Sequence, residues 1–260
     1  MQSSVFSKWA RGHQFDSHVV LPAVMSLLLI ALYFSGNTFL QQLVAPKFAN
    51  MPLFSAREFG ILEILQNILL LGIVFYATRC VVAAEDWWVK LAALLLVVVS
   101  VFTFLEEIDY GIHVVEYITG DYGSLEQENW SRNWHNRTGA DGVQNVSHVK
   151  LAANLGLLSG FVIAPLLLSS VRNRTIRMLL PLRWTIATVA LIALLSVLAH
   201  YLDDAGYAVI GGEPGNLHKN ISEFREMNMY YLMLVYVAVL HERVISNRSA
   251  PIIGNTDARY

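Results

Sequence analysis

The sequence predicts an all-α integral membrane protein with about six transmembrane helices. Its composition is 55% hydrophobic and only 15% charged, with a mean hydropathy of +0.47. The apolar residues gather into blocks close to the roughly 20 residues that a helix needs to cross a bilayer. A net charge of −2 gives no reason to expect nucleic acid as a partner, and the single Cys80 excludes an internal disulfide. The lipid bilayer is the expected partner.

Each expected span follows from one apolar block and its polar flanks. The first block comes after Lys8 and Arg11, like the apolar part of a signal sequence, but no small-residue cleavage site follows, so the helix is expected to be retained. The sixth has an apolar core of only 14 residues, 227–240, and reaches a spanning length only with charged residues near its ends. The expected spans are 18–39, 59–78, 87–105, 151–169, 184–202 and 224–244, in a single membrane domain 1–260 with one long outer loop, 106–150.

A weak internal repeat favours three tandem helical hairpins. Phe104-Leu105-Glu106-Glu107 is followed by Asn-Trp-His at 133–135, and Tyr201-Leu202-Asp203-Asp204 is followed by Asn-Leu-His at 216–218. Each carboxylate pair closes one expected helix and precedes the next. The repeat therefore places similar polar groups at the same end of successive hairpins.

The distribution of Lys and Arg predicts the orientation. The connection 171–183 holds four arginines and no acid, whereas the loop 106–150 holds eight acids and three bases. Because Lys and Arg are enriched in cytoplasmic loops, the arginine connection and both termini are expected inside the cell. The acidic loop is then expected on the outer, periplasmic side of a bacterial inner membrane.

Polar side chains gather where the expected spans meet the outer boundary. Glu63 lies about one turn inside the second span and is followed by Gln66 and Asn67. A carboxylate inside a span is costly to desolvate unless it is paired, protonated or bound to a cation, so Glu63 is expected to face the bundle interior. The competing interpretation is that helix ends are wet and carry charges for that reason alone.

The end of the third span carries the densest group. If the helix continues past Leu105, Glu106, Asp109 and His113 lie on one face at i, i+3 and i+7. The adjacent Glu106 and Glu107 point about 100° apart, so only one of them is expected to face a shared site.

Carboxylates and imidazoles in this arrangement are typical of acid–base or metal sites. Oxygen ligands suit calcium, magnesium or manganese, and added imidazoles make iron or zinc possible, so a divalent metal is a candidate cofactor. The candidate catalytic groups are Glu63, Glu107 and His135, and the candidate metal ligands are His200, Asp203, Glu226, Glu223, Glu106 and His113. If the site is a single one, Glu107, His135, His200, Asp203 and Glu226 should converge.

Two motifs resemble those of a group of uncharacterised bacterial multi-pass inner-membrane proteins. They are Glu-Glu-x-x-aromatic-Gly at 106–111 and Asn-x-His-Asn at 133–136; the pattern from Glu58 to Gln66 and the late glutamates Glu223 and Glu226 are also similar. Ile112 departs from the glutamine expected after Gly111. The resemblance implies a bacterial inner-membrane setting and a shared polar site, and it implies no reaction.

Two functions from different classes remain open at this point. The first is a membrane-embedded, metal-assisted enzyme that acts from the outer face on a lipid or lipid-linked substrate. The second is a non-catalytic subunit whose outer surface docks a membrane-protein partner in a larger complex. Stoichiometric metal in the purified protein favours the first, and a constant co-purifying partner without metal favours the second.

The predicted orientation can be tested with reporter fusions. A reporter fused after Arg177 is expected on the cytoplasmic side and one fused after Asp141 on the opposite side, because the arginine connection is retained inside. Activity of a paired cytoplasmic and periplasmic reporter at each position measures this. If both positions report the same side, the topology is wrong.

Overall fold

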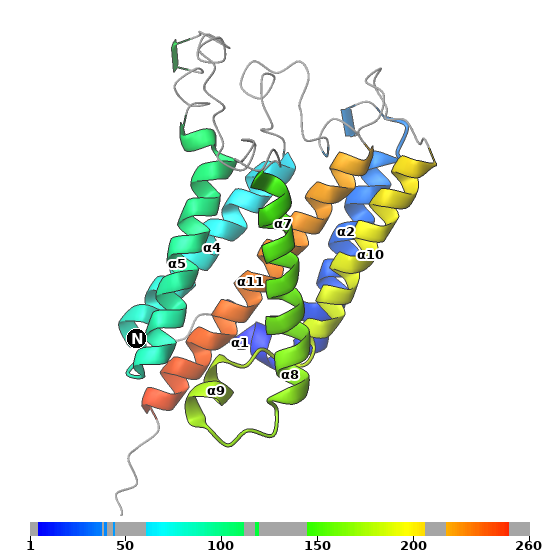
Figure 1. The fold of residues 1–260 in the computed structure, drawn as a ribbon. Helices are drawn as coiled ribbons and strands as arrows, with labels where there is room; N and C mark the ends of the chain where they lie inside the picture. Colours follow the sequence, from blue (N-terminus) through cyan, green and yellow to red (C-terminus); the bar gives the residue numbers. More distant parts are fainter. Residues whose placement is uncertain are drawn as a thin grey trace, which may run out of the picture.

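The predicted fold class is confirmed by the computed structural model, which describes residues 5–37, 39–40, 44, 61–111, 118–119, 145–205 and 217–249. Within these residues every regular element is a helix, and the long helices run side by side as a bundle (Figure 1). Five are long and apolar enough to cross a membrane, and a bent pair at the amino end makes up to six. The chain is a multi-pass, all-α membrane protein.

The amino end forms the bent pair. The short helix α1 (Val5–Gly12) is followed by a π-helical turn, Asp16–Val20, that continues into α2 (Leu21–Tyr33), and the two parts are bent by 96°. Pro22 follows this turn and has no N–H to donate to the His18 carbonyl four residues earlier; that carbonyl accepts from the Thr188 hydroxyl at 2.8 Å instead. α2 ends at Tyr33, short of the expected boundary at 39, so this span begins and ends earlier than the hydropathy indicates.

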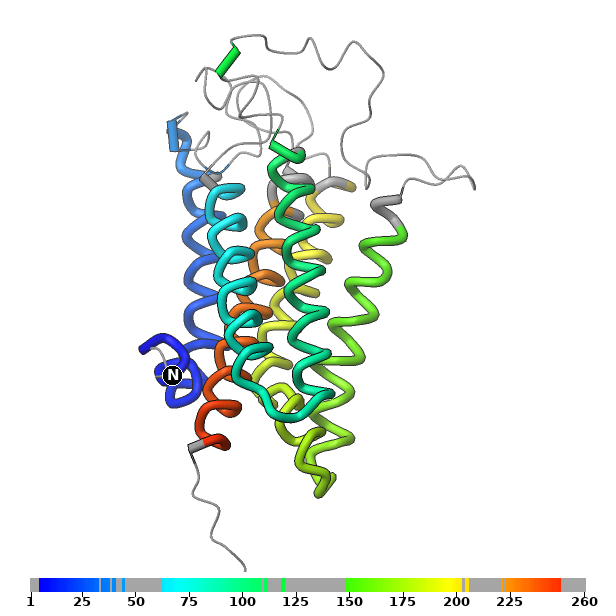
Figure 2. The backbone as a smooth tube through the Cα atoms, turned by 90° about the vertical axis from the view of Figure 1, so that its left-hand side faces the viewer, coloured from blue at the N-terminus to red at the C-terminus, as the bar shows by residue number. Residues whose placement is uncertain are grey.

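The second and third spans form a close pair, α4 (Ile61–Ala83) and α5 (Trp87–Glu107), which lie side by side in both views (Figures 1 and 2). α5 begins at the expected residue because Asp86 caps it: its Oδ1 accepts from the backbone N–H of Trp88 at 2.8 Å and of Val89 at 3.4 Å. α4 extends to Ala83, beyond the expected boundary at 78.

The fourth span is continuous but irregular. It consists of α7 (Asn145–Gly156), a π-helical segment, Leu157–Ile163, and α8 (Ala164–Leu167). The short helix α9 (Arg174–Leu179) lies in the arginine connection, and α10 (Thr185–Asp204) forms the fifth span. The π-helical segment of the fourth span supplies a carbonyl to the fifth span, because the Thr185 hydroxyl of α10 donates to the Phe161 carbonyl at 3.0 Å.

The last helix, α11 (Leu217–Ser249), is the most enclosed element. It packs against α1, α2, α4 and α10, and Figure 2 shows it inside the bundle. Leu232, Val235 and Leu240 are fully buried along it. With 33 residues, it is longer than a minimal span, so the charged residues near the ends of the expected sixth span are accommodated within one helix.

A glycine sets the spacing between α4 and α11. A Cβ atom on Gly72 would lie 2.9 Å from Cδ1 of Leu234. The hydrogen at this position lets the Leu234 side chain lie directly against the α4 backbone. The two helices therefore pack closely at this point.

The outward surface is apolar on α5 and on the fourth span. Val98, Val99 and Phe102 are exposed on α5, and Leu158 and Leu166 on the fourth span. An apolar exposed surface of this extent is the surface expected toward lipid chains. The bundle therefore has a protein-facing core around α11 and a lipid-facing side formed by α5 and the fourth span.

The pairing of Asp86 outside the spans gives a pH-dependence. The Thr175 hydroxyl of α9 donates to Oδ2 of Asp86, and this hydrogen bond, with the cap, lowers the pKa of Asp86 below its usual 3.8. A carboxyl whose pKa is lowered in the folded state stabilises that state at every pH above the pKa of the unfolded chain. This stabilisation is lost as the pH falls through the lowered pKa of the folded state.

We expect Asp86→Asn, which keeps a capping oxygen, to lower the Tm at pH 6 and to converge with the wild type as the pH falls through the lowered pKa of Asp86. Thermal unfolding in detergent across this range measures the effect. Glu85→Gln, an exposed neighbour that pairs loosely with Arg248 at 3.8 Å, is the control. A constant difference between Asp86→Asn and the wild type would contradict the pairing.

Candidate functional site

Three helices bring glutamates to one end of the bundle. α4 begins there with Glu63, α5 ends with Glu106 and Glu107, and α11 contributes Glu223 and Glu226 in its first turns. These five side chains, with Gln66, Asn67 and Tyr230, are called the carboxylate cluster below. This end lies opposite the end that carries α9 and the arginine connection (Figure 1).

The α4 side of the cluster is buried. Glu63 has only 4% of its surface exposed, and Gln66 is fully buried beside it, one turn further along the same face. The expected burial of Glu63 is confirmed. Gln66 Nε2 donates to the backbone carbonyl and to Oε2 of Glu223, both at 3.1 Å, so α4 is joined to α11 through a carboxylate.

The α5 side places its two glutamates in different directions. Glu106 is buried and accepts a hydrogen bond from the Tyr110 hydroxyl. Glu107 accepts from the Tyr230 hydroxyl of α11 at 2.8 Å. The 100° separation of adjacent helical residues thus gives each glutamate its own partner, and Glu107 is the one that reaches another helix.

The expected stripe of Glu106, Asp109 and His113 on one continuing helix is wrong. α5 ends at Glu107, and Tyr110 has a positive φ of 53°, followed by Gly111 at 83°. A left-handed residue cannot continue an α-helix, and here it turns the Tyr110 ring back toward Glu106. Asp109 belongs to a short 3₁₀ turn after the helix, and His113 lies outside the described residues.

Tyr230 connects the parts of the cluster. It lies four residues after Glu226 and seven after Glu223, on the same face of α11. The carboxylates of Glu107, Glu226 and Glu223 all act electrostatically on its hydroxyl. Sequence reasoning missed Tyr230 because an aromatic residue within an apolar block is usually part of a core; the i+4 and i+7 spacing was the available signal.

One cationic side chain accompanies the glutamates within the helix segments of the cluster. In the segments 61–70, 102–107 and 223–231, that side chain is Arg225. Its Nη2 lies 3.8 Å from Oε1 of the adjacent Glu226, a long contact between partly exposed groups. An ion pair with this geometry contributes little to stability.

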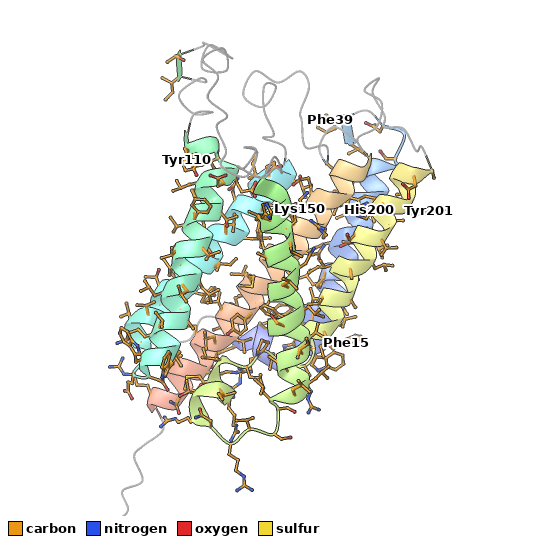
Figure 3. All side chains as sticks on the ribbon, in the orientation of Figure 1. Phe15, Phe39, Tyr110, Lys150, His200 and Tyr201 are labelled. Atoms are coloured by element: carbon orange, nitrogen blue, oxygen red, sulfur yellow. The ribbon has the colours of Figure 1, made fainter. Side chains whose placement is uncertain are left out.

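Among the histidines expected in the site, His200 is the one that the structure describes, and it lies on α10, outside the three helices of the cluster. It is exposed near the end of α10, as Figure 3 shows beside Tyr201. The side chain of Asp203 and the whole of His135 lie outside what the structure describes. Among the described members of the five residues expected to converge, Glu107 and Glu226 lie near the same Tyr230 hydroxyl.

The described side chains do not form a metal centre. Among them, no group of three or more His, Cys, Asp or Glu residues is arranged so that it could hold one ion. First-shell ligands must lie within about 2.0–2.6 Å of an ion, which requires their side chains to converge. The glutamates of the cluster are instead spread over three helices, each directed toward a separate hydrogen-bond donor or neighbour.

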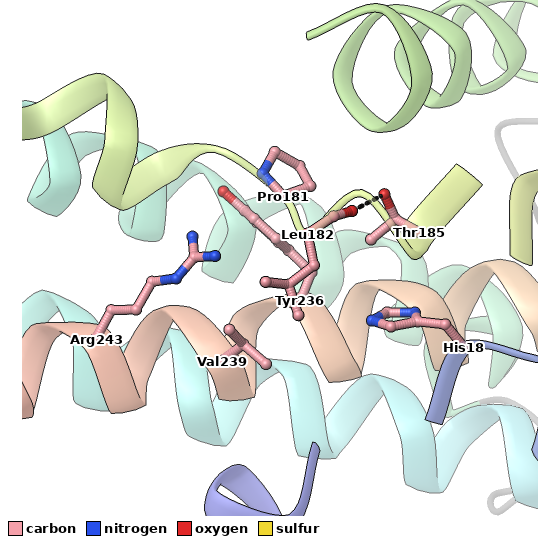
Figure 4. Close-up of a pocket in the computed structure, with 7 residues that line it drawn as sticks. All are labelled: His18, Pro181, Leu182, Thr185, Tyr236, Val239 and Arg243. Carbon is pink, nitrogen blue, oxygen red and sulfur yellow. Dashed lines mark hydrogen bonds between the residues drawn. The ribbon is translucent and has the colours of Figure 1, made fainter. Parts of the chain in front are cut away.

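A second polar grouping lies near the arginine end of α11. His18, Thr185, Tyr236 and Arg243 come together there from the amino-terminal turn, α10 and α11 (Figure 4). These groups pack so closely that no water-sized space remains between them. Arg243 Nη1 donates to the carbonyls of Met178 and Leu180, at 2.9 and 2.5 Å, which holds the α9 connection against the bundle. This grouping is structural.

Comparisons with protein-family models, with curated proteins and with solved structures find no match to this chain. The carboxylate cluster is therefore the feature of the molecule from which a function can be inferred.

The hydrogen bond between Tyr230 and Glu107 should be measurable in stability. Tyr230→Phe removes the donated O–H, and hydrogen bonds to charged groups contribute about 1.5–3 kcal/mol. Tyr236→Phe is a matched control, since its hydroxyl donates to the neutral Leu179 carbonyl at 2.8 Å and should cost about 0.5–1.5 kcal/mol. Chemical unfolding in detergent measures both.

A double-mutant cycle with Glu107→Gln isolates the pair. We expect the effects of Tyr230→Phe and Glu107→Gln to be non-additive, because each variant removes the same contact. Additive effects would show that the two side chains do not interact energetically.

Proposed function

We propose that this multi-pass membrane protein is an enzyme whose carboxylate cluster performs acid–base chemistry on a lipid or lipid-linked substrate. The observation that supports the proposal is that glutamates of α5 and α11 lie near one tyrosine hydroxyl, while Gln66 of α4 donates to one of them. Two glutamates of the cluster, Glu63 and Glu106, are buried, and Glu107 is half-buried and accepts from a tyrosine. Carboxyl groups in such different environments are suited to moving protons.

The roles follow from the surroundings of each group. Glu107 is half-buried and oriented by the Tyr230 hydroxyl, so it is proposed as the group that exchanges a proton with the substrate. Glu63 is enclosed by protein, and a carboxyl there is favoured in a protonated or paired form. It is proposed as a proton store that supports Glu107.

Access from the bilayer favours a lipid substrate. α5 ends with Glu107, and Val101, Phe102 and Leu105, within the two preceding turns, are exposed. Acyl chains can lie against this face, while their polar ends reach the level of the cluster. Phe102 and Leu105 face away from Glu107 around the helix, so a substrate that stays in the bilayer would reach Glu107 past the end of α5, at the level where its polar group lies.

Metal assistance is not part of this proposal. The glutamates that the structure describes are not arranged as a shared ligand set, so no step is derived through an ion. An outer location in a bacterial inner membrane, with both termini cytoplasmic, remains the expected setting from the distribution of arginines.

Activity can be tested on total lipid extract from a bacterial inner membrane. Purified protein is incubated with the extract, and lipid species are quantified by mass spectrometry. Wild type and the control Glu85→Gln should both convert at least one species, whereas Glu107→Gln should lose about 10²- to 10⁴-fold of the rate, the usual contribution of a general acid or base.

Size-exclusion profiles establish that each variant is folded. Tyr230→Phe leaves Glu107 in place and is expected to lose less of the conversion rate than Glu107→Gln. An extract left unchanged by the wild type, or full activity of Glu107→Gln, would contradict the proposal. Purification with a constant protein partner and no lipid conversion would favour a docking subunit.

A further inference from the structure

We propose that the connection between the fourth and fifth spans binds the phosphate of an anionic phospholipid, with Arg172 and Arg183 as its main contacts. The connection lies at the end of the bundle opposite the carboxylate cluster (Figure 1), and this binding does not depend on the enzymatic function proposed above. Three features carry the inference: the charge of the connection, the way its arginines are held, and the apolar surface beside them.

The connection 168–184 is strongly basic. It contains four arginines and neither aspartate nor glutamate. Arg174 acts electrostatically on the Asp86 carboxylate, before the start of α5. The other three arginines are exposed and form no ion pair with any residue that the structure describes: Arg172, Arg177 and Arg183. Arginines grouped directly after a span attract the anionic headgroups of the adjacent leaflet.

The backbone that carries these arginines is fixed against the bundle. Arg243 of α11 donates to two carbonyls of the connection, and the Thr175 hydroxyl donates to Asp86. Asn173, the residue after Arg172, caps α9 by accepting from a backbone N–H at 3.1 Å. Positive charge that only orients a membrane protein requires none of these contacts. The connection therefore presents its arginines in a defined arrangement.

Arg183 and Arg172 belong to the same corner of the connection. Arg183 Nη2 donates to Oγ of Ser169 at 2.8 Å, which joins the start of the fifth span to the end of the fourth. Arg172 follows directly after a turn in which the Val171 N–H donates to the Leu168 carbonyl at 3.1 Å. A guanidinium has five N–H donors in a planar fork that matches the oxygens of a phosphate. This corner is therefore suited to holding one phosphate between two arginines.

Exposed apolar side chains lie beside this corner. Leu167, at the end of α8, is 73% exposed, and Trp184, the residue after Arg183, is 43% exposed. Phe15 packs edge-on against Trp184, with the ring centroids 5.5 Å apart, and Figure 3 shows Phe15 toward the end of the bundle that carries α9. Tryptophan side chains commonly lie at the level of lipid headgroups. A phospholipid can thus place its chains against these side chains, whereas a soluble anion would make the charge contacts alone.

The charge of the corner favours an anionic lipid over a zwitterionic one. In a zwitterionic headgroup, a cationic amine accompanies the phosphate. The arginines would repel this amine, and the connection has no carboxylate to pair with it. An anionic headgroup such as phosphatidylglycerol gains the phosphate contacts without this repulsion.

The test uses purified full-length protein in detergent with three lipid probes of matched chains: phosphatidylglycerol, phosphatidylethanolamine and phosphatidylcholine. Retained lipid is quantified by native mass spectrometry. Phosphatidylglycerol should be retained about tenfold better than either zwitterionic lipid. Because the arginines are exposed, this preference should shrink as the salt concentration of the incubation rises.

Variants locate the site. Arg172→Gln and Arg183→Gln should each reduce retention of phosphatidylglycerol about tenfold, the usual effect of losing hydrogen bonds to a charged group. Arg248→Gln is the matched control, since it removes an exposed arginine outside the connection and should leave retention unchanged. Ser169→Ala removes the hydroxyl that holds Arg183 but keeps both charges, so its loss should be smaller.

Size-exclusion profiles establish that the variants are folded. The Arg172 side chain makes no hydrogen bond or ion pair with a described residue, so Arg172→Gln tests the site even if Arg183→Gln fails to fold. Equal retention of the three lipids, or unchanged retention in folded Arg172→Gln, would overturn the inference. An equal loss in Arg248→Gln would also overturn it, because general charge would then explain the retention. Displacement of the lipid by inorganic phosphate at equal concentration would refute its lipid part.

Discussion

The contact between α4 and α11 is the constraint on which the rest of the structure depends. Gly72 allows Leu234 to lie against the α4 backbone, and the seam continues through Leu70, Ile73 and Val237 in one buried cluster. In a membrane, apolar side chains gain little by leaving lipid for protein, so helices associate largely through close packing and through hydrogen bonds between them. A small residue at the point of closest approach meets the first requirement.

Hydrogen bonds from α11 to its neighbours provide the second source of association between the helices. Asn228 donates to the Ser26 hydroxyl at 2.9 Å, and Tyr231 donates to the Ser17 carbonyl at 2.7 Å, which joins α11 to the amino-terminal span. The carboxylate cluster is an extension of the same principle to charged groups, since Gln66 and Tyr230 each hold a glutamate across a helix interface. The packing of α11 thus determines both the core and the geometry of the candidate site.

The site is consequently asymmetric. α11 supplies two glutamates and the tyrosine from one face, α4 supplies buried groups, and α5 closes the cluster from the lipid side. α5 also carries exposed apolar side chains, so it separates the cluster from the lipid side of the bundle. The cluster therefore lies at the helix ends, where the polar groups of α4, α5 and α11 come to the same level.

The amino-acid sequence by itself determined the class of the protein and the approximate place of each span. An apolar block of about 20 residues satisfies its backbone hydrogen bonds in lipid by forming a helix, so each block predicts one span. The burial of Glu63 followed from the cost of a carboxylate against acyl chains. These inferences depend on local composition and on the properties of the solvent, which a single sequence contains.

Only the tertiary structure decided which polar groups meet. The sequence placed Glu106, Asp109 and His113 on one helix face, but the left-handed conformation of Tyr110 ends that pattern. It also gave His200 the same weight as Glu107, although His200 faces outward from α10 and Glu107 reaches Tyr230. Rotation of each helix about its axis is set by packing with its neighbours, and in an almost uniformly apolar span the sequence carries little periodicity from which that rotation can be read.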